Sequence, residues 1–152
     1  MKRLALAVVL AACGGPGTTG QPTITLSPGT STLEVEVEGL RSEKGSLDCA
    51  LFNAPDGFPG PSPIVGGAHQ LAASTRPMRC TFDALPAGTY AVSVQHDEDG
   101  DGELDTNFVG VPTEGYGVTN NVYPGTRAPT FEEAQVSIGD GEQHTFTITL
   151  KY

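Results

Sequence analysis

The sequence of 152 residues contains no tryptophan, three cysteines and few basic side chains. Eight lysines and arginines stand against 18 aspartates and glutamates, which gives a formal net charge of −10. A chain this acidic is repelled by nucleic-acid phosphates and by anionic membrane surfaces, so we expect neither as a direct partner. Without tryptophan, the core has to be built from Val, Leu, Ile, Phe and Tyr.

Several chemical signatures are absent as well. The sequence has no Gly-x-Ser-x-Gly elbow, no zinc-ligand motif and no phosphate-binding loop. It has no internal repeat, and beyond the first twelve residues no stretch longer than one turn has helical periodicity. The residues therefore give no support for a catalytic role, and we expect a protein that is not an enzyme.

The first residues have the composition of an export signal. Lys2 and Arg3 precede an apolar run, residues 4–12, which ends in small side chains before Cys13. The run is shorter than the about 20 residues that a membrane-spanning helix needs. Its end, Leu-Ala-Ala-Cys, resembles the lipobox of bacterial lipoproteins, in which cleavage precedes a cysteine that carries lipid. We expect a signal peptide at residues 1–12 and lipidation of Cys13; an ordinary cleaved signal with a chance cysteine is the alternative.

The residue after the cysteine bears on the expected location. Gly14 stands where an aspartate is the familiar signal for inner-membrane retention. We therefore expect an exported protein that is lipid-anchored in the cell envelope, in the outer membrane where the cell has one, at its periplasmic face or the cell surface. The membrane is then a partner through the lipid on Cys13. Loss of Lys2 and Arg3 with the leader would change the net charge from −10 to −12.

Composition divides the rest of the chain into a spacer and one domain. Residues 13–31 are rich in Gly, Pro, Thr and Ser, which predicts a flexible spacer. Residues 32–152 have the length of a single domain. With Cys13 lipidated, Cys49 and Cys80 are the remaining pair, and we expect them to form a disulfide in an exported chain. Two separately buried thiols are the alternative.

Alternation of apolar and polar residues predicts short strands. In Thr-Leu-Glu-Val-Glu-Val-Glu, for example, Leu33, Val35 and Val37 share one face. The strands predicted in this way lie at residues 32–38, 46–53, 77–82, 85–96 and 144–150. The Pro- and Gly-rich residues 53–74 are expected to form a long surface connection, and residues 129–139 one helical turn and a short strand at 136–138. This pattern indicates an all-β fold, an antiparallel β-sandwich.

One acidic stretch, residues 96–107, places carboxylates at alternate positions around two glycines. It opens as the Asp-x-Asp-x-Asp-Gly of an EF-hand-type calcium loop does, in which a curled backbone directs several oxygens to one cation. The predicted calcium ligands are the carboxylates of Asp97, Asp99, Asp101 and Asp105 and the backbone carbonyl of Glu103.

The similarity to an EF-hand stops after this opening. Loop position twelve holds Phe108 instead of glutamate, and a strand precedes the loop instead of a helix, so we expect the loop chemistry without the EF-hand fold. An Asp/Gly hairpin made only for solvent is the alternative. The calcium shell would be completed by one of the nearby oxygen-bearing side chains: Glu114, Thr106, Asn107, Asn120 or Asn121.

A larger pattern surrounds the acidic stretch. Leu-Pro-Ala-Gly-Thr-Tyr begins at Leu85, the His-Asp loop follows at His96, and Gly-Val-Pro-Thr-Glu-Gly-Tyr-Gly begins at Gly110 and leads to Asn-Asn. These motifs resemble an uncharacterised bacterial family, domain of unknown function 2141, although Val118 and Thr119 stand where the family often has Phe and Ser. The resemblance implies an exported Ig-like or transthyretin-like β-sandwich with a long Asp/Gly-rich loop and no established activity.

Three functional hypotheses remain. The first is a non-catalytic, lipid-anchored envelope domain whose calcium-ordered loop presents a surface for a protein or glycan partner. The second is a calcium-dependent carbohydrate-binding module in which Tyr116 and Tyr123 stack on the sugar, with Phe108 nearby. The third is a hydrolase that uses the loop carboxylates. We expect His96 to pack against the loop and orient an aspartate.

Overall fold

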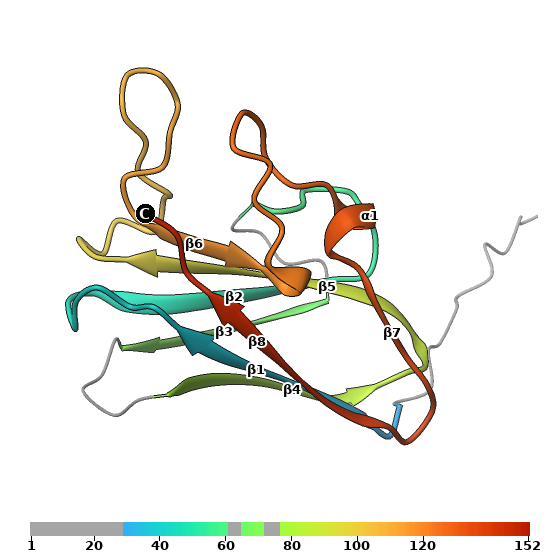
Figure 1. The fold of residues 1–152 in the computed structure, drawn as a ribbon. Helices are drawn as coiled ribbons and strands as arrows, with labels where there is room; N and C mark the ends of the chain where they lie inside the picture. The colour runs from blue at the N-terminus through green and yellow to red at the C-terminus, as the bar shows by residue number, and fades with distance from the viewer. Residues whose placement is uncertain (1–28, 61–64, 72–76) are drawn as a thin grey trace, which may run out of the picture.

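The computed structural model describes residues 29–60, 65–71 and 77–152. Its regular structure is nearly all β, arranged in two sheets that face each other (Figure 1). The smaller sheet has the strand order β4 (Met78–Leu85), β1 (Ser31–Glu38), β8 (Gln143–Thr149). The larger sheet has the order β3 (Gly66–Leu71), β2 (Ser46–Phe52), β5 (Gly88–Asp97), β6 (Gly115–Val118), and β7 (Val136–Ile138) also pairs with β5. Helix is limited to α1 (Phe131–Ala134) and the 3-10 turn η1 (Thr119–Asn121).

The expected signal peptide, lipidated Cys13 and most of the spacer lie outside the described residues. Within those residues, no helix is long and apolar enough to span a bilayer.

Strand β1 follows the predicted alternation. Leu33, Val35 and Val37 are buried, while Glu34 and Glu36 lie on the opposite face and are partly exposed. The strand pairs antiparallel with β4 but parallel with β8. The expectation of a wholly antiparallel fold is therefore wrong for this one pair. The chain leaves the smaller sheet and returns to it through the larger one, and such a crossover allows a parallel neighbour that a hairpin does not.

Two strands were not predicted as such. Strand β3 lies within the segment that we expected to be a surface connection, and its sequence, Gly-Gly-Ala-His-Gln-Leu, has no apolar alternation. It pairs along β2, with Ala68 opposite Cys49, so backbone hydrogen bonding to a neighbouring strand determines it more than side-chain pattern does. Strand β6 is only four residues long. The predicted helical turn and short strand near residue 136 are confirmed as α1 and β7.

The core lies between the two sheets and combines inward side chains of β1, β2, β5 and β8. The expected disulfide between Cys49 and Cys80 is present and joins β2 of one sheet to β4 of the other, with a Cα–Cα distance of 6.5 Å. The two cysteines are 31 positions apart. In the chain-entropy model, closing a loop of that size stabilises the fold by roughly 3–4 kcal/mol.

A second apolar cluster covers part of the outer face of the larger sheet. Phe131 of α1 packs with Phe58, which in turn packs edge-on against Phe52 of β2. The turn is fixed by a capping box between Thr130 and Glu133. Helix α1 therefore shields only one part of this face, near the end of β2.

The two ends of the molecule carry different features. Strand β1 starts beside Leu85, where the Ser31 hydroxyl donates to the Gly139 carbonyl at 2.7 Å. Its eight residues span about 25 Å. At the far end, the Glu38 carbonyl accepts from Leu150 N–H. The acidic loop after β5 lies at this second end, away from the point where the described chain begins (Figure 1).

Candidate functional site

The acidic loop begins at Asp97, the last residue of β5, whose side chain is buried. The two oxygens of this carboxylate accept backbone N–H groups from within the loop, from Gly100 at 2.6 Å and from Gly102 at 2.9 Å. Both glycines have φ near +80°, a left-handed conformation that costs other residues more. The sequence therefore curls the backbone around Asp97, as the calcium-loop pattern predicts.

The next two aspartates continue this curl. An oxygen of Asp99 accepts the N–H of Asp101 at 3.2 Å, and an oxygen of Asp101 accepts the N–H of Glu103 at 2.8 Å. The Glu103 carbonyl accepts from the Gln95 amide at 2.5 Å. An acceptor oxygen retains a second lone pair, so these hydrogen bonds orient the oxygens and leave them able to bind a cation.

Glu114 completes the cluster from a distant part of the loop. Its side chain is buried, and its two oxygens accept the N–H groups of Glu98 at 2.7 Å and Asp105 at 3.2 Å. One oxygen each from Asp97, Asp99 and Glu114 lie within 4.8 Å of one another. The sequence placed Glu114 among five candidates for the last ligand, and its position after a Gly-x-Pro-x motif was the only signal available.

The other predicted ligands lie around this group. Asp101, Glu103 and Asp105 are exposed and are not among the three residues whose oxygens converge. Charges within the loop nevertheless affect the pKa of one of these carboxyl groups. Desolvation raises the pKa of the Asp105 carboxyl, and the negative charges of Asp99 and Asp101 raise it further. The loop is therefore a region of concentrated negative potential that a cation would relieve.

Three of the other side chains considered for the shell have structural partners. The Asn107 oxygen accepts the N–H groups of Val109 and Val111. The Asn120 amide donates to the Glu133 and Gln135 carbonyls, and Asn121 binds the backbone of Thr147 and Thr149 in β8. Asn120 and Asn121 adopt positive φ, and their hydrogen bonds hold η1 against its neighbours.

His96 does not orient an aspartate, so that expectation is wrong. It is fully buried, with Nδ1 at 2.7 Å from the Tyr152 hydroxyl and Nε2 at 2.9 Å from the Lys44 carbonyl. Strand alternation points His96 to the core side of β5, whereas Asp97 points to the outer side. The histidine thus ties the base of the loop to the C-terminal residue.

Arg41 also contacts the base of the acidic loop and Tyr152. Its guanidinium forms an ion pair with Glu98 and lies 4.3 Å from the centre of the Tyr152 ring. The hydrogen bond from Arg41 lowers the pKa of the Glu98 carboxyl, and the Ser42 hydroxyl, at 2.5 Å, lowers it further. Glu98 is thereby kept ionised and engaged, so it holds the loop in place and does not face the carboxylate cluster.

Beyond the cluster, the chain forms a narrow hairpin. Thr106 is bridged to Pro112, and Asn107 N–H donates to the Val111 carbonyl at 2.8 Å. The hairpin projects from the body of the molecule (Figure 1). Its apolar tip, which we define as Phe108, Val109 and Val111, is exposed, with Phe108 at 99%. Single exposed apolar side chains are common, but several that lie together often mark an interaction site, and three exposed apolar residues lie together on this tip.

Residues 35–146 match the family described as uncharacterized protein conserved in bacteria, DUF2141. The chain belongs to this family. The matched segment contains the acidic loop, Glu114 and the apolar tip, and it starts within β1 and ends within β8. Searches of curated proteins and of solved structures found no match.

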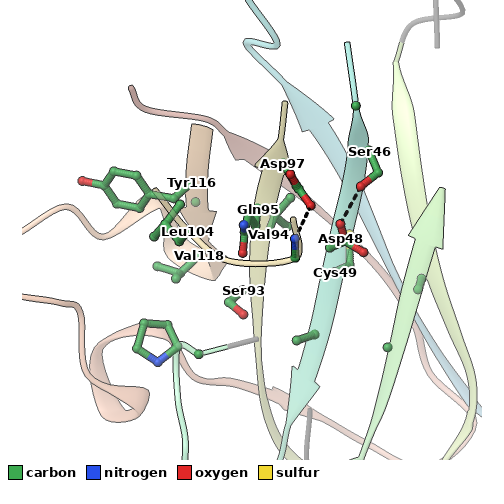
Figure 2. A pocket seen from close by; sticks show the side chains of 18 of the residues that line it. Ser46, Asp48, Cys49, Ser93, Val94, Gln95, Asp97, Leu104, Tyr116 and Val118 are labelled. Atoms are coloured by element: carbon green, nitrogen blue, oxygen red, sulfur yellow. Dashed lines mark hydrogen bonds between the residues drawn. The ribbon is translucent and has the colours of Figure 1, made fainter. Parts of the chain in front are cut away.

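This DUF2141 domain also has a groove of about 750 Å³ on the outer face of its larger sheet (Figure 2). One wall is the acidic loop, through Gly100, Gly102 and Leu104. The sequence pattern did not reveal the groove, because its residues come from β2, β3, β5, β6 and several connections. The outward side chains of β2 and β5 that line it are small or polar: Ser46, Asp48, Ala50, Ser93, Gln95 and Asp97.

Proposed function

We propose that this protein is a non-catalytic domain of the bacterial cell envelope, exported and anchored by lipid on Cys13, whose acidic loop binds one calcium ion and presents a surface to a protein partner. The observation that carries the proposal is the convergence of Asp97, Asp99 and Glu114, whose oxygens lie within 4.8 Å of one another. We also propose that its two sheets form an Ig-like or transthyretin-like sandwich with a long Asp/Gly-rich loop.

The spacing of these oxygens suits calcium. Calcium binds oxygens at about 2.3–2.6 Å, so two ligands of one ion lie at most about 5 Å apart. The separation of up to 4.8 Å between the three carboxylates falls inside that limit. Magnesium resists dehydration and demands a stricter octahedron at about 2.0–2.1 Å, so we expect it to bind more weakly. In the proposed site, Asp101, Asp105 and the Glu103 carbonyl supply further oxygens directly or through water.

The position of the apolar tip supports a protein partner. The tip follows directly on the acidic loop, and it lies at the end of the domain opposite to the start of β1. A lipid anchor ahead of β1 would therefore attach at the opposite end of the domain and leave this end free to reach a partner. Because the carboxylates at the base of the tip repel anionic lipid, an apolar pocket in a protein is a better match for Phe108 than a second bilayer.

The way the loop uses its carboxylates supports a non-catalytic role. A glycosidase-type hydrolase needs two carboxyl groups in unlike environments that face the substrate. Here Asp97 and Glu114 are both buried and both accept two backbone N–H groups. They are held alike, and one oxygen of each lies within 4.8 Å of the other, which supports a cation site over a catalytic pair.

Calorimetry of the purified full-length chain in detergent, titrated with calcium, magnesium and zinc, tests the metal proposal. We expect one calcium per chain and weaker magnesium binding. Calcium at one hundred times its Kd stabilises the folded state by about 2.7 kcal/mol, which raises the melting temperature by several degrees. Asp99→Asn with Glu114→Gln should abolish both effects.

Asp56→Asn is the matched control, because Asp56 is an exposed acid in a turn outside the loop. This variant should bind calcium as the wild type does. If the wild type melts at the same temperature in excess chelator and in millimolar calcium, the loop is a solvated acidic turn.

The anchor is tested separately by Cys13→Ser. The wild-type protein should be processed and should partition into detergent, because several acyl chains each contribute about 0.8 kcal/mol per buried methylene. The variant should remain unprocessed or appear in the soluble fraction. Equal processing and equal membrane association of the two proteins would rule out lipidation at this cysteine.

A further inference from the structure

The groove on the outer face of the larger sheet exists because small side chains meet there. Ala50 of β2 lies directly opposite Ser93 of β5, and Asp48 lies opposite Gln95. Directly paired residues have Cβ atoms about 4.5–5.5 Å apart, so a pair of small residues leaves a depression that long neighbours would fill. The cluster around α1 covers the sheet beyond Ala50 and ends there. The acidic loop rises on the opposite side, and the space between them is the groove (Figure 2).

One hydroxyl in the groove is not hydrogen-bonded to the part of the chain that the structure describes. Ser93 is 8% exposed and lines the groove, and its side chain makes no hydrogen bond to any residue that the structure describes. No buried side-chain oxygen or nitrogen of the described residues lacks a hydrogen bond, so the Ser93 hydroxyl reaches the open space of the groove and is available to a ligand that enters it.

The charges in the groove exclude an anionic ligand. None of the described lining residues is basic, and three of them are aspartates: Asp48, Asp97 and Asp101. A cation would bind at the loop carboxylates, which form the proposed calcium site, so the rest of the groove offers it only Asp48. Asp97 and Asp101 accept loop N–H groups, and Asp48 accepts the Ser46 hydroxyl at 2.9 Å. The charge balance therefore favours a neutral ligand that offers hydroxyl donors and acceptors.

The apolar part of the groove lies beside these polar groups. Tyr116 is directly opposite Gln95 across β5 and β6, and Val118 is opposite Ser93. Leu104 reaches the same space from the acidic loop. Hydroxyl, amide and carboxylate groups next to an aromatic ring suit a sugar, which has polar hydroxyls on its rim and apolar C–H faces. The volume of about 750 Å³ lies within the range of about 300–1,000 Å³ for small-molecule sites.

We propose that this groove binds a segment of a neutral glycan, with Ser93 and Gln95 as hydrogen-bonding residues and Tyr116 as the ring against which a sugar packs. The proposal deepens the proposed function by giving a second surface a ligand class, and it rests on that function only where the calcium loop forms one wall. Tyr123 has a supporting place: its ring packs edge-on against Tyr116 at 5.9 Å, and its hydroxyl donates to the Thr149 carbonyl.

The test uses the full-length protein in detergent with four defined probes: cellotetraose and chitotetraose as neutral sugars, tetragalacturonate as an anion and spermine as a cation. Binding is followed by two-dimensional NMR and calorimetry, in calcium and in chelator. We expect at least one neutral tetrasaccharide to bind with a millimolar Kd or better and to shift the resonances of Ser93, Gln95 and Tyr116. Tighter binding in calcium is expected, because the metal would fix the loop wall.

The matched variants are Ser93→Val and Thr145→Val. Both replace a strand residue that carries a hydroxyl by valine, but Thr145 is exposed on β8 of the other sheet. Ser93→Val should weaken sugar binding about tenfold or more, whereas Thr145→Val should leave it unchanged. Equal weakening by both variants, or no weakening by Ser93→Val, overturns the proposal.

The remaining outcomes also decide. Tighter binding of tetragalacturonate or spermine than of the neutral sugars overturns the proposal, as does the absence of neutral sugar binding at millimolar concentration. If Ser93→Val does not fold, the wild-type shift map is sufficient, and sugar-induced shifts that lie outside the groove overturn it. Calcium binding is also measured without sugar, which separates the two proposals. Sugar binding without calcium binding would contradict only the proposed calcium site. Calcium binding without sugar binding would contradict only the proposed glycan groove.

Discussion

On the outer face of the smaller sheet, β1 carries Glu34, Glu36 and Glu38, and β8 carries threonines at its alternate positions. On the outer face of the larger sheet, the same kind of positions carry serine, alanine, glutamine and phenylalanine together with two aspartates, Asp48 and Asp97. Side chains of the first face form ion pairs with one another: a guanidinium nitrogen of Arg79 lies 3.5 Å from a Glu34 oxygen and another lies 3.3 Å from a Glu36 oxygen. The second face is partly covered by α1 and partly hollow.

This difference shows where a site can form on a two-sheet protein. Long charged side chains that pair across strands fill the space above a sheet and leave no depth. Small side chains create depth, and a covering element that stops partway along the sheet gives that depth a wall. The acidic loop supplies the other wall, so the groove and the candidate metal site both belong to the larger sheet.

The largest expected effect is a loss of unfolding free energy that depends on which outer face is mutated. Phe52→Ala removes a side chain that is fully buried on the outer face of the larger sheet, where it packs edge-on against Phe58 at 5.3 Å. The loss should be about 3–5 kcal/mol, as for other buried aromatic residues. Glu36→Ala on the outer face of the smaller sheet is the control and should change the free energy of unfolding by less than about 1 kcal/mol. Urea denaturation of the two variants measures this, and equal effects would remove the contrast between the faces.

A smaller effect is expected from the ion pairs of the other face. Arg79→Ala breaks both contacts with Glu34 and Glu36 and leaves these glutamates next to each other. Because Arg79 is about half exposed, the loss should be at most about 1 kcal/mol, and it should shrink as salt is added. Denaturation at low and high ionic strength provides the measurement. A loss that is larger and independent of salt would mean that Arg79 contributes through packing.

The smallest effect concerns pH and the helical turn that covers the larger sheet. The Arg127 guanidinium lowers the pKa of the Glu133 carboxyl to about 2, and the backbone N–H of Thr130 contributes. A carboxyl whose pKa is lowered on folding stabilises the fold above its unfolded pKa, near 4.5, and this stabilisation is lost as the pH falls towards 2.

Glu133→Gln keeps a residue suited to the capping box but removes the charge. Its melting temperature should be slightly below that of the wild type at pH 7, and the difference should disappear near pH 2. Glu132→Gln is the control, because Glu132 is the exposed neighbour on the same turn. A difference for Glu133→Gln that persists at pH 2 would contradict the assigned cause.

The sequence predicted the elements that depend on short-range pattern. Alternation in β1 and β8 gave both strands and their buried faces, and Phe-Glu-Glu-Ala before Val136 gave the single helical turn. Strand β3 was missed, because glycines without apolar alternation form a strand only when a neighbour offers its hydrogen bonds. The parallel pairing of β1 with β8 could not be predicted from local sequence pattern either, because it depends on how distant strands are arranged in a sheet.

The candidate site divides in the same way. Asp97, Asp99 and the glycines of the acidic loop were recognisable from their spacing, because a curled loop brings alternate residues together whatever surrounds it. His96 was misjudged, since its partners are the backbone of Lys44 and the C-terminal Tyr152, which no local pattern connects to it.

By itself, then, the sequence predicted most of the strands, Cys49 and Cys80 as the expected disulfide pair, and an acidic chain with an Asp/Gly-rich loop that has the spacing of a calcium loop. These features follow from neighbours in the chain, from residue counts and from the number of cysteines. Only the tertiary structure brought Glu114 to within 4.8 Å of Asp97 and Asp99, and only it formed the groove beside Ser93. The physical reason is that oxygens and cavity walls from distant segments come together through sheet pairing and burial, which depend on the whole chain.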